Sequence, residues 1–240
     1  MKTGKTAIVT GASQGIGACL VKTLLERRYN VVATARSMAK SGFQASKQLA
    51  LVDGDIGEAS TAKQIAETAV ERFGGIDTLV NNAGIYFIKP FPAYTTEDIG
   101  KLFSTNLYGF IYLSQLVVTQ MLKQKTGGSV VSISAFLAEH PIAGVTASVP
   151  MMTKGGIESI SKNLAMEYAK EGIRFNAVAP GEVDTPLNKD NPKDFLRTLS
   201  PMGSISDAQE IVDAVVFLAE APHITGEVLY VDGGAHVGKW

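Results

Sequence analysis

Thr10-Gly11-Ala12-Ser13-Gln14-Gly15-Ile16-Gly17 is the stretch that decides the fold of this chain. An apolar run at residues 6–10 leads into it and predicts a buried strand, and residues 15–28 follow it with apolar side chains at helical spacing. Glycines at such a turn permit positive φ angles and let a ligand approach the backbone, while the first N–H groups of the helix attract phosphate. The stretch therefore predicts a dinucleotide-binding turn, although a tight turn without a ligand would use the same glycines.

Short apolar runs alternate with longer helical patterns along the rest of the chain. Further strands are predicted at residues 30–34, 49–52, 76–80, 128–133, 174–178 and 227–231, and further helices at residues 59–73, 97–122, 152–170 and 207–220. Strands separated by helices are joined by right-handed crossovers, which produce a parallel sheet covered on both faces. The predicted fold is an α/β, Rossmann-like, doubly wound parallel sheet of about seven strands, in a single domain spanning residues 1–240.

Two segments do not fit this alternation. Residues 37–48 are polar and predict either a loop or a short helix. Residues 186–201 lack a clear period, and we interpret them as a mobile lid over a substrate site, because loops carried by a rigid scaffold often bind substrates.

Composition excludes several classes of function. The net charge is −1 and no basic stripe is visible, which argues against nucleic acid or an anionic membrane as the main partner. No apolar run approaches the ~20 residues of a membrane span. The single cysteine, Cys19, rules out an intrachain disulfide, and no cluster of His, Cys and carboxylate residues predicts a metal site. We therefore expect a soluble, cytoplasmic protein.

Further motifs follow the glycine turn in a characteristic order: Asn81-Asn82-Ala83-Gly84, Asn106, Lys154, Pro180-Gly181 and Asp232-Gly233-Gly234. With the spacing Gly-x-x-x-Gly-x-Gly at residues 11–17, they make the chain resemble the short-chain dehydrogenase/reductase family over essentially its whole length. This resemblance implies a nicotinamide dinucleotide cofactor and hydride transfer to or from a small organic substrate. It also implies a homo-oligomer, a tetramer or dimer built on the two long helices and the last strand, although a buried core would explain the apolar faces of these helices equally well. A separate hypothesis is that residues 236–240 pack on a neighbouring subunit.

The end of the second strand indicates which nicotinamide cofactor binds. An acidic residue there would bind the ribose hydroxyls of NAD, but this chain has Ala35 followed by Arg36. Arg36 can pair with the 2′-phosphate of NADP through charge-assisted hydrogen bonds, and Ser13 can add a hydroxyl donor. NADP(H) is therefore predicted over NAD(H), the alternative being that Arg36 is a solvated surface charge.

The resemblance extends the cofactor site along the chain. It implies that Asp55 and Ile56 flank the adenine, and that the segment after the fourth strand approaches the ribose and nicotinamide. The complete predicted cofactor set is Gly11, Ser13, Gln14, Gly15, Ile16, Gly17, Arg36, Asp55, Ile56, Asn82, Ala83, Gly84, Lys154, Pro180, Gly181, Val183 and Thr185.

The family places an Asn, a Ser, a Tyr and a Lys around the reacting carbonyl, and the tyrosine is missing here. Lys154 and Asn106 match the motif, but Pro150 stands four residues before Lys154, where the tyrosine is expected. Ala135 occupies the usual place of the serine, which leaves Ser134 as its substitute. The predicted catalytic residues are therefore Lys154, Asn106 and Ser134.

A proton donor other than residue 150 would have to serve an active enzyme. His140, with an unperturbed pKa near 6.5, and Tyr86 are candidates, although each has a plain structural alternative, an exposed loop histidine and an aromatic of the pocket wall. We expect an NADP(H)-dependent oxidoreductase that interconverts a carbonyl and an alcohol. The alternatives are a catalytically impaired NADP-binding sensor or partner protein, and non-redox chemistry such as elimination on the same scaffold.

Overall fold

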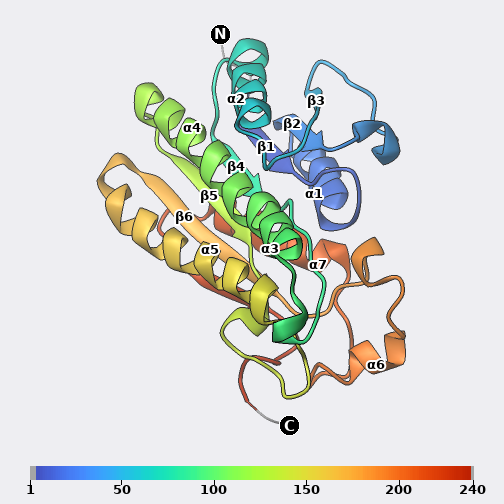
Figure 1. Ribbon diagram of the computed structural model, residues 1–240. Helices are drawn as coiled ribbons and strands as arrows, with labels where there is room; N and C mark the ends of the chain where they lie inside the picture. The colour runs from blue at the N-terminus through green and yellow to red at the C-terminus, as the bar shows by residue number, and fades with distance from the viewer. Residues whose placement is uncertain (1–3, 239–240) are drawn as a thin grey trace.

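A seven-stranded parallel sheet forms the centre of the computed structural model, which describes residues 4–238 (Figure 1). The strands lie in the order β3-β2-β1-β4-β5-β6-β7, and the order reverses between β1 and β4. In sheets of this kind, ligands bind at the carboxyl ends of the strands where the order reverses. The predicted fold class is confirmed, with strands β1 (Thr6–Thr10), β2 (Asn30–Ala35), β3 (Leu49–Asp53), β4 (Thr78–Asn81), β5 (Gly128–Ile133), β6 (Ile173–Pro180) and β7 (Val228–Val231).

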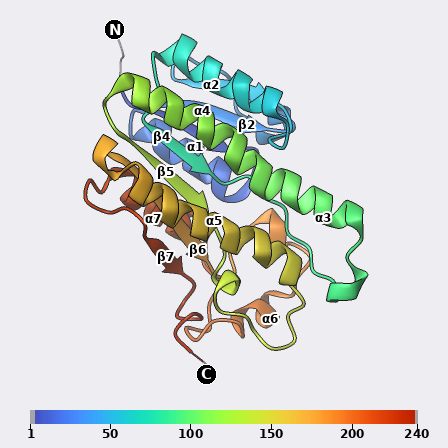
Figure 2. The same cartoon turned by 60° about the vertical axis from the view of Figure 1, so that its left-hand side comes forward.

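Helices cover both faces of the sheet because successive side chains of each strand point to opposite faces. Ala7 and Val9 of β1 pack in one apolar core with α1 (Gly15–Glu26) and α7 (Ala208–Glu220). Ile8 packs in the other core, with α2 (Ala59–Phe73), α4 (Gly109–Gln124) and α5 (Ser148–Glu167), which lie side by side in Figure 2. Burial on both faces explains why the strands read as continuous apolar runs.

The helix predicted over residues 97–122 runs without a break from Thr96 to Gln124, but it is not α-helical throughout. It consists of α3 (Thr96–Leu102), a π-helical stretch η3 (Phe103–Tyr108) and α4. Asn106 lies inside η3, where its side chain bonds to the backbone of Ile85. Apolar periodicity does not reveal one extra residue in a turn, and such π turns frequently occur at functional sites.

Shorter elements connect the main ones. Residues 37–48 contain the 3-10 helix η1 (Met38–Ser41), and residues 186–201 contain η6 (Pro186–Asn188) and the short helix α6 (Lys193–Arg197). Three further 3-10 turns are η2 (Phe91–Ala93), η4 (Phe136–Ala138) and η5 (Ala169–Glu171). Of residues 236–240, which are predicted to pack on a neighbouring subunit, residues 239–240 lie outside the described residues. Between residues 4 and 238, no helix combines the length and apolarity that a membrane span requires.

Candidate active site

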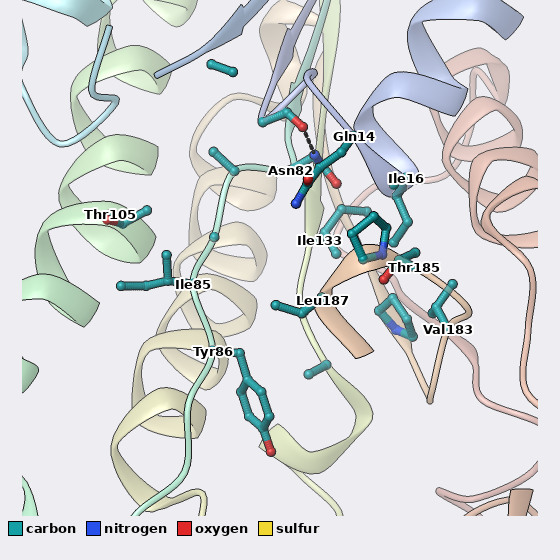
Figure 3. A pocket seen from close by; sticks show the side chains of 18 of the residues that line it. Gln14, Ile16, Asn82, Ile85, Tyr86, Thr105, Ile133, Val183, Thr185 and Leu187 are labelled. Carbon is teal, nitrogen blue, oxygen red and sulfur yellow. Dashed lines mark hydrogen bonds between the residues drawn. The ribbon is translucent and has the colours of Figure 1, made fainter. Parts of the chain in front are cut away.

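A cavity of about 730 Å³ opens at the carboxyl ends of the strands (Figure 3). Its walls come from the loops after β1, β2, β3, β4, β5 and β6, together with the start of α5 and the segment around η6. The volume lies within the range typical of small-molecule and cofactor sites. The point where the strand order reverses is therefore hollow, as the fold predicts.

The turn at residues 10–17 requires glycine at positions 11, 15 and 17. Gly11 and Gly15 have φ angles of 65° and 54°, in the left-handed region. A Cβ on Gly11 would lie 2.8 Å from the Cα of Ala83, and a Cβ on Gly17 would lie 2.3 Å from the carbonyl oxygen of Gly11. These glycines therefore allow the backbone of the turn to pack against itself and against the loop after β4.

Asn82 fastens the loop after β4 to the glycine turn. Its side-chain Nδ2 donates to the carbonyl oxygens of Thr10 and Gly11, at 2.8 and 3.2 Å. The backbone N–H groups of Asn82 and Ala83 both donate to Thr10 Oγ1, at 3.0 and 2.9 Å. The two motifs thus form one rigid wall of the cavity.

The start of α1 is available to an anion. Gln14 precedes the helix but makes no side-chain capping hydrogen bond, and the first turn contains no acidic residue. The first N–H groups of a helix need external partners and carry a partial positive charge. Gln14, Gly15 and Ile16 line the cavity here, so a phosphate group fits this wall.

Two cations line the cavity at the end of β2. Arg36 follows the strand, and Lys40 reaches the cavity from η1, which is held in place because Met38 N donates to Asp53 Oδ1 at 2.6 Å. Both side chains are exposed, and neither forms an ion pair with another residue in the part of the chain that the structure describes. This end of the cavity is positively charged.

Lys154 lines the opposite part of the cavity. Its Nζ donates to the carbonyl oxygen of Ile133 at 2.8 Å and lies 3.2 Å from where a Cβ of Gly84 would be. Desolvation by burial lowers the pKa of Lys154 to about 8, and the negative charge of Glu158 opposes that shift. The ammonium group is therefore still mostly protonated at neutral pH and loses its proton as the pH rises through about 8.

Asn106 is buried behind the cavity wall and does not line it. Its Oδ1 accepts from Ile85 N at 2.9 Å, and its Nδ2 donates to Ile85 O at 3.1 Å and to Thr153 Oγ1 at 2.9 Å. Since Thr153 precedes Lys154 in α5, Asn106 connects the loop after β4 to the helix that carries the lysine.

Ser134 lines the cavity, but its hydroxyl is engaged by α5. The Oγ donates to Glu158 Oε1, and Lys154 O lies 3.3 Å away as a second acceptor. Glu158 is buried, and burial raises the pKa of its carboxyl while the bond from Ser134 lowers it. In this arrangement the serine hydroxyl retains only its lone pairs for a further partner.

Pro150 lies buried in the first turn of α5, where it supplies no proton donor. Its carbonyl oxygen accepts from Thr153 Oγ1 at 2.7 Å. A proline suits this position because the first N–H groups of a helix lack intrahelical acceptors.

Of the two alternative proton donors, His140 and Tyr86, only Tyr86 lines the cavity. His140 does not line the cavity; its ring packs against Tyr230 and His236, with ring centroids 5.3 and 5.7 Å apart. Tyr86 does line it and extends away from Gln14 and Asn82 in Figure 3. Burial, and then the charge of Glu182, raise the pKa of Tyr86 to about 12, so its phenol stays protonated at neutral pH.

Most of the cofactor and catalytic residues predicted from the sequence line the same cavity. All members of the predicted cofactor set line the cavity except Gly17, and of the catalytic set Lys154 and Ser134 line it. Sequence reasoning missed Lys40, Glu182 and Asn188, which belong to segments without a clear period. The only available signal was their closeness along the chain to Arg36 and to the Pro180-Gly181 motif. Among residues 4–238, no group of His, Cys, Asp or Glu side chains could hold a metal ion.

Known proteins match the chain over nearly its full length. A family model described as Enoyl-(Acyl carrier protein) reductase matches residues 11–236. The L-rhamnose 1-dehydrogenase (NAD(P)(+)) of Sphingomonas sp. strain SKA58 is 32% identical over 98% of this chain and 97% of its own. The 3-oxoacyl-acyl-carrier-protein reductase FabG of Escherichia coli K12 is 34% identical over 98% of each chain.

Solved structures agree with these matches. ElxO with NADP bound has a TM-score of 0.90 at 28% identity, covering 99% of this chain and 100% of the other. The 3-ketoacyl-(acyl-carrier-protein) reductase from Brucella melitensis complexed with NADH has a TM-score of 0.91 at 28% identity, covering 97% and 98%. Sequence and fold lead to the same conclusion: the chain belongs to the short-chain dehydrogenase/reductase family, whose relatives named above are oxidoreductases.

Proposed function

We propose that this protein is an NADP(H)-dependent oxidoreductase that transfers a hydride between nicotinamide and a carbonyl or alcohol of a small organic substrate. The observation that carries the proposal is one continuous cavity with a free helix N-terminus and two cations at one end and Lys154 at the other. A similar solved structure holds NADP and another holds NADH, which supports a nicotinamide cofactor. Calorimetric titration with NADPH and NADH tests the binding step directly.

The cofactor would be held by the residues predicted from the sequence. Gly11, Ser13 and the start of α1 receive the phosphates, Asp55 and Ile56 flank the adenine, and Asn82 to Gly84 line the ribose. The nicotinamide end would be held by Lys154 and by the loop after β6, with Pro180, Gly181, Val183 and Thr185. When bound, the cofactor supplies or accepts the hydride.

Arg36 and Lys40 support the preference for NADP(H), because a 2′-phosphate at the end of β2 would meet two cations, and the one carboxylate in this end of the cavity wall, Asp55, lies after β3. Arg36→Ala is expected to weaken NADPH binding by about 10- to 100-fold, since a hydrogen bond to a charged group contributes about 1.5–3 kcal/mol. NADH binding should be unchanged. Calorimetry with both nucleotides checks this, with Arg27→Ala at the far end of α1 as the control. Equal losses for both nucleotides would contradict the assignment.

The chain's own residues divide the remaining work. Lys154 places a positive charge beside the reacting end, and Asn106 positions Lys154 through Thr153. Ser134 can accept a hydrogen bond at the cavity wall. The protonated phenol of Tyr86 is the donor that we assign in place of the missing tyrosine, because it lines the cavity and His140 does not.

The pH dependence of catalysis follows from Lys154. The kcat/KM for NADPH-dependent reduction is expected to fall as pH rises through about 8, because the free enzyme then loses the ammonium charge. Lys154→Arg should remove this fall, since the guanidinium stays protonated throughout the range. Steady-state rates of both proteins between neutral and alkaline pH provide the measurement. A wild-type profile that stays flat across this range would mean that the charge of Lys154 has no role.

A second candidate function is that of a catalytically impaired NADP-binding sensor or partner protein, and Pro150 is the observation that favours it. Both functions require tight cofactor binding. They differ in turnover, which NADPH oxidation with a panel of ketones, aldehydes and quinones would reveal. The relatives named above act on a sugar and on an acyl carrier protein derivative, so family membership leaves the substrate open.

We propose that the protein assembles as a homo-oligomer, a tetramer or dimer. Large apolar side chains are exposed along η3 and α4 (Tyr108, Leu116 and Leu122) and along α5 (Met152 and Met166). Pairing of these helices between two copies would bury these side chains. Light scattering on the purified protein tests this assembly.

A further inference from the structure

Glu182 offers one carboxylate oxygen to the cavity. It follows Pro180-Gly181 at the end of β6 and lines the cavity. Its Oε2 accepts from Asn188 Nδ2 at 3.0 Å, and the same amide donates to Val183 O at 3.1 Å, which fixes the carboxylate against η6. Within residues 4–238, the structure gives Oε1 no hydrogen-bond partner. One oxygen is thus held by the protein while the other is free for a ligand.

Tyr86 lines the same cavity from the loop after β4, and its ring points away from the glycine turn (Figure 3). Its hydroxyl likewise has no hydrogen-bond partner in the described part of the chain. The charge of Glu182 contributes to the raised pKa of Tyr86, so the two groups lie close enough to interact. Glu182 also borders a smaller neighbouring cavity. Burial raises the pKa of its carboxyl, and the hydrogen bond from Asn188, a residue that lines the main cavity, lowers it.

No cation lines this part of the site. The titratable residues of the cavity wall are Arg36, Lys40, Asp55, Tyr86, Lys154 and Glu182. The first three lie at the end where the adenosine part is expected, and Lys154 is expected at the ribose. Glu182 and Tyr86 therefore dominate the place left for the part of the substrate beyond the reacting carbonyl, and a carboxylate or phosphate group there would be repelled by Glu182.

The free carboxylate oxygen of Glu182 and the hydroxyl of Tyr86 together fit one kind of ligand group. A carboxylate oxygen only accepts hydrogen bonds, whereas a protonated phenol can donate one. A hydroxyl group can donate to Glu182 and accept from Tyr86 at the same time. An ammonium group can donate but cannot accept, so it would leave the phenol unsatisfied, and buried polar groups without partners are costly.

We propose that Glu182, held by Asn188, is a specificity-determining residue that accepts a hydrogen bond from a substrate hydroxyl, and that the substrate is a neutral carbonyl compound carrying hydroxyl groups, a hydroxyketone, hydroxyaldehyde or sugar. This inference rests on the proposed reductase function. Because the phenol of Tyr86 has one proton, it bonds to the substrate hydroxyl when the substrate binds and must turn to the carbonyl oxygen during reduction. Hydroxyl-bearing substrates should therefore be preferred over their deoxy or carboxylated counterparts.

Matched substrates test the proposal. NADPH oxidation is measured with acetone, hydroxyacetone, dihydroxyacetone and pyruvate, and with propanal against glyceraldehyde. The hydroxylated member of each pair is expected to have a kcat/KM at least about 10-fold higher, because sites built to bind a hydroxyl discriminate strongly against its absence. Preference for acetone, propanal or pyruvate would overturn the proposal.

Variants then assign the preference to the carboxylate. Glu182→Gln and Glu182→Ala should lower kcat/KM for hydroxylated substrates by about 10- to 100-fold, mainly through KM, as expected for a lost hydrogen bond to a charged group. Their calorimetric affinity for NADPH should not change, and their activity on acetone should change much less than their activity on the hydroxylated substrates. Asp184→Asn is the matched control: it removes the same charge two residues away, from an exposed side chain paired with Lys193 that does not line the cavity. The same change in kcat/KM for hydroxylated substrates in Glu182→Gln, Glu182→Ala and Asp184→Asn would overturn the proposal.

Failure of the reductase proposal can be distinguished from failure of this one. If NADPH binds but no compound is reduced, the redox function fails. The hydroxyl site is then decided by calorimetric titration of dihydroxyacetone and glyceraldehyde into NADP-saturated protein. Binding that weakens in Glu182→Ala but not in Asp184→Asn supports the site, and no binding to the wild type rejects it.

Discussion

Pro150→Tyr is expected to raise the rate of NADPH-dependent carbonyl reduction by about 10²- to 10⁴-fold, the usual contribution of a positioned general acid. The new phenol would lie one helical turn before Lys154, on the same face of α5. The nearby ammonium charge would lower the pKa of that phenol and favour proton transfer near neutral pH. Steady-state kinetics with the preferred carbonyl substrate gives the measurement.

Pro150→Phe is the matched control for this gain. It introduces a ring of the same size without the hydroxyl, so it shares the packing cost of a large side chain at a buried position, about 1–3 kcal/mol. Thermal unfolding should show similar destabilisation of both variants, and only the tyrosine should gain activity. A rate increase shared by both variants would show that the proton donor is not what limits the wild-type protein.

Gly17→Ala is expected to abolish measurable NADP(H) binding. The added Cβ would lie 2.3 Å from the carbonyl oxygen of Gly11 and 2.6 Å from Asn82 Nδ2, so the glycine turn and the loop after β4 must separate. We expect a loss of about 1–3 kcal/mol in the free energy of unfolding from this overpacking. Calorimetry with NADPH and denaturant unfolding measure the two effects.

Gly100→Ala provides the comparison, because Gly100 also lies in a helix and a Cβ there would meet nothing within 4 Å. Alanine is preferred over glycine inside helices by about 0.8–1 kcal/mol, so this variant should be slightly more stable and bind NADPH normally. Wild-type affinity in Gly17→Ala would show that residues 11–17 do not contact the nucleotide.

The fold could be predicted because several local rules agree. The strand at residues 6–10 and the helix at residues 59–73 have the predicted bounds, since a fully buried strand is apolar throughout and an amphipathic helix has a clear period. Most of the cofactor residues could be placed for the same reason: glycines at a strand-to-helix turn leave few alternative geometries.

The remaining features depend on contacts that a linear pattern does not carry. The π-helical stretch at Asn106 depends on bonds to Ile85 and Thr153, which lie 21 and 47 residues away along the chain. Lys40 and Glu182 reach the cavity from irregular segments, where no period indicates the direction of a side chain. Ser134 could be placed at the cavity, but its bond to the buried Glu158 could not be foreseen.

The cavity wall draws on residues from Gly11 to Asn188, so a bound dinucleotide would tie the loops of six separate strands to one another. A ligand that binds only the folded chain, present at 100 times its dissociation constant, adds about 2.7 kcal/mol to the free energy of unfolding. That increment would protect the molecule as a whole against proteolysis. The lifetime of the protein in a cell would then follow the supply of its nucleotide, independently of whether a substrate is turned over.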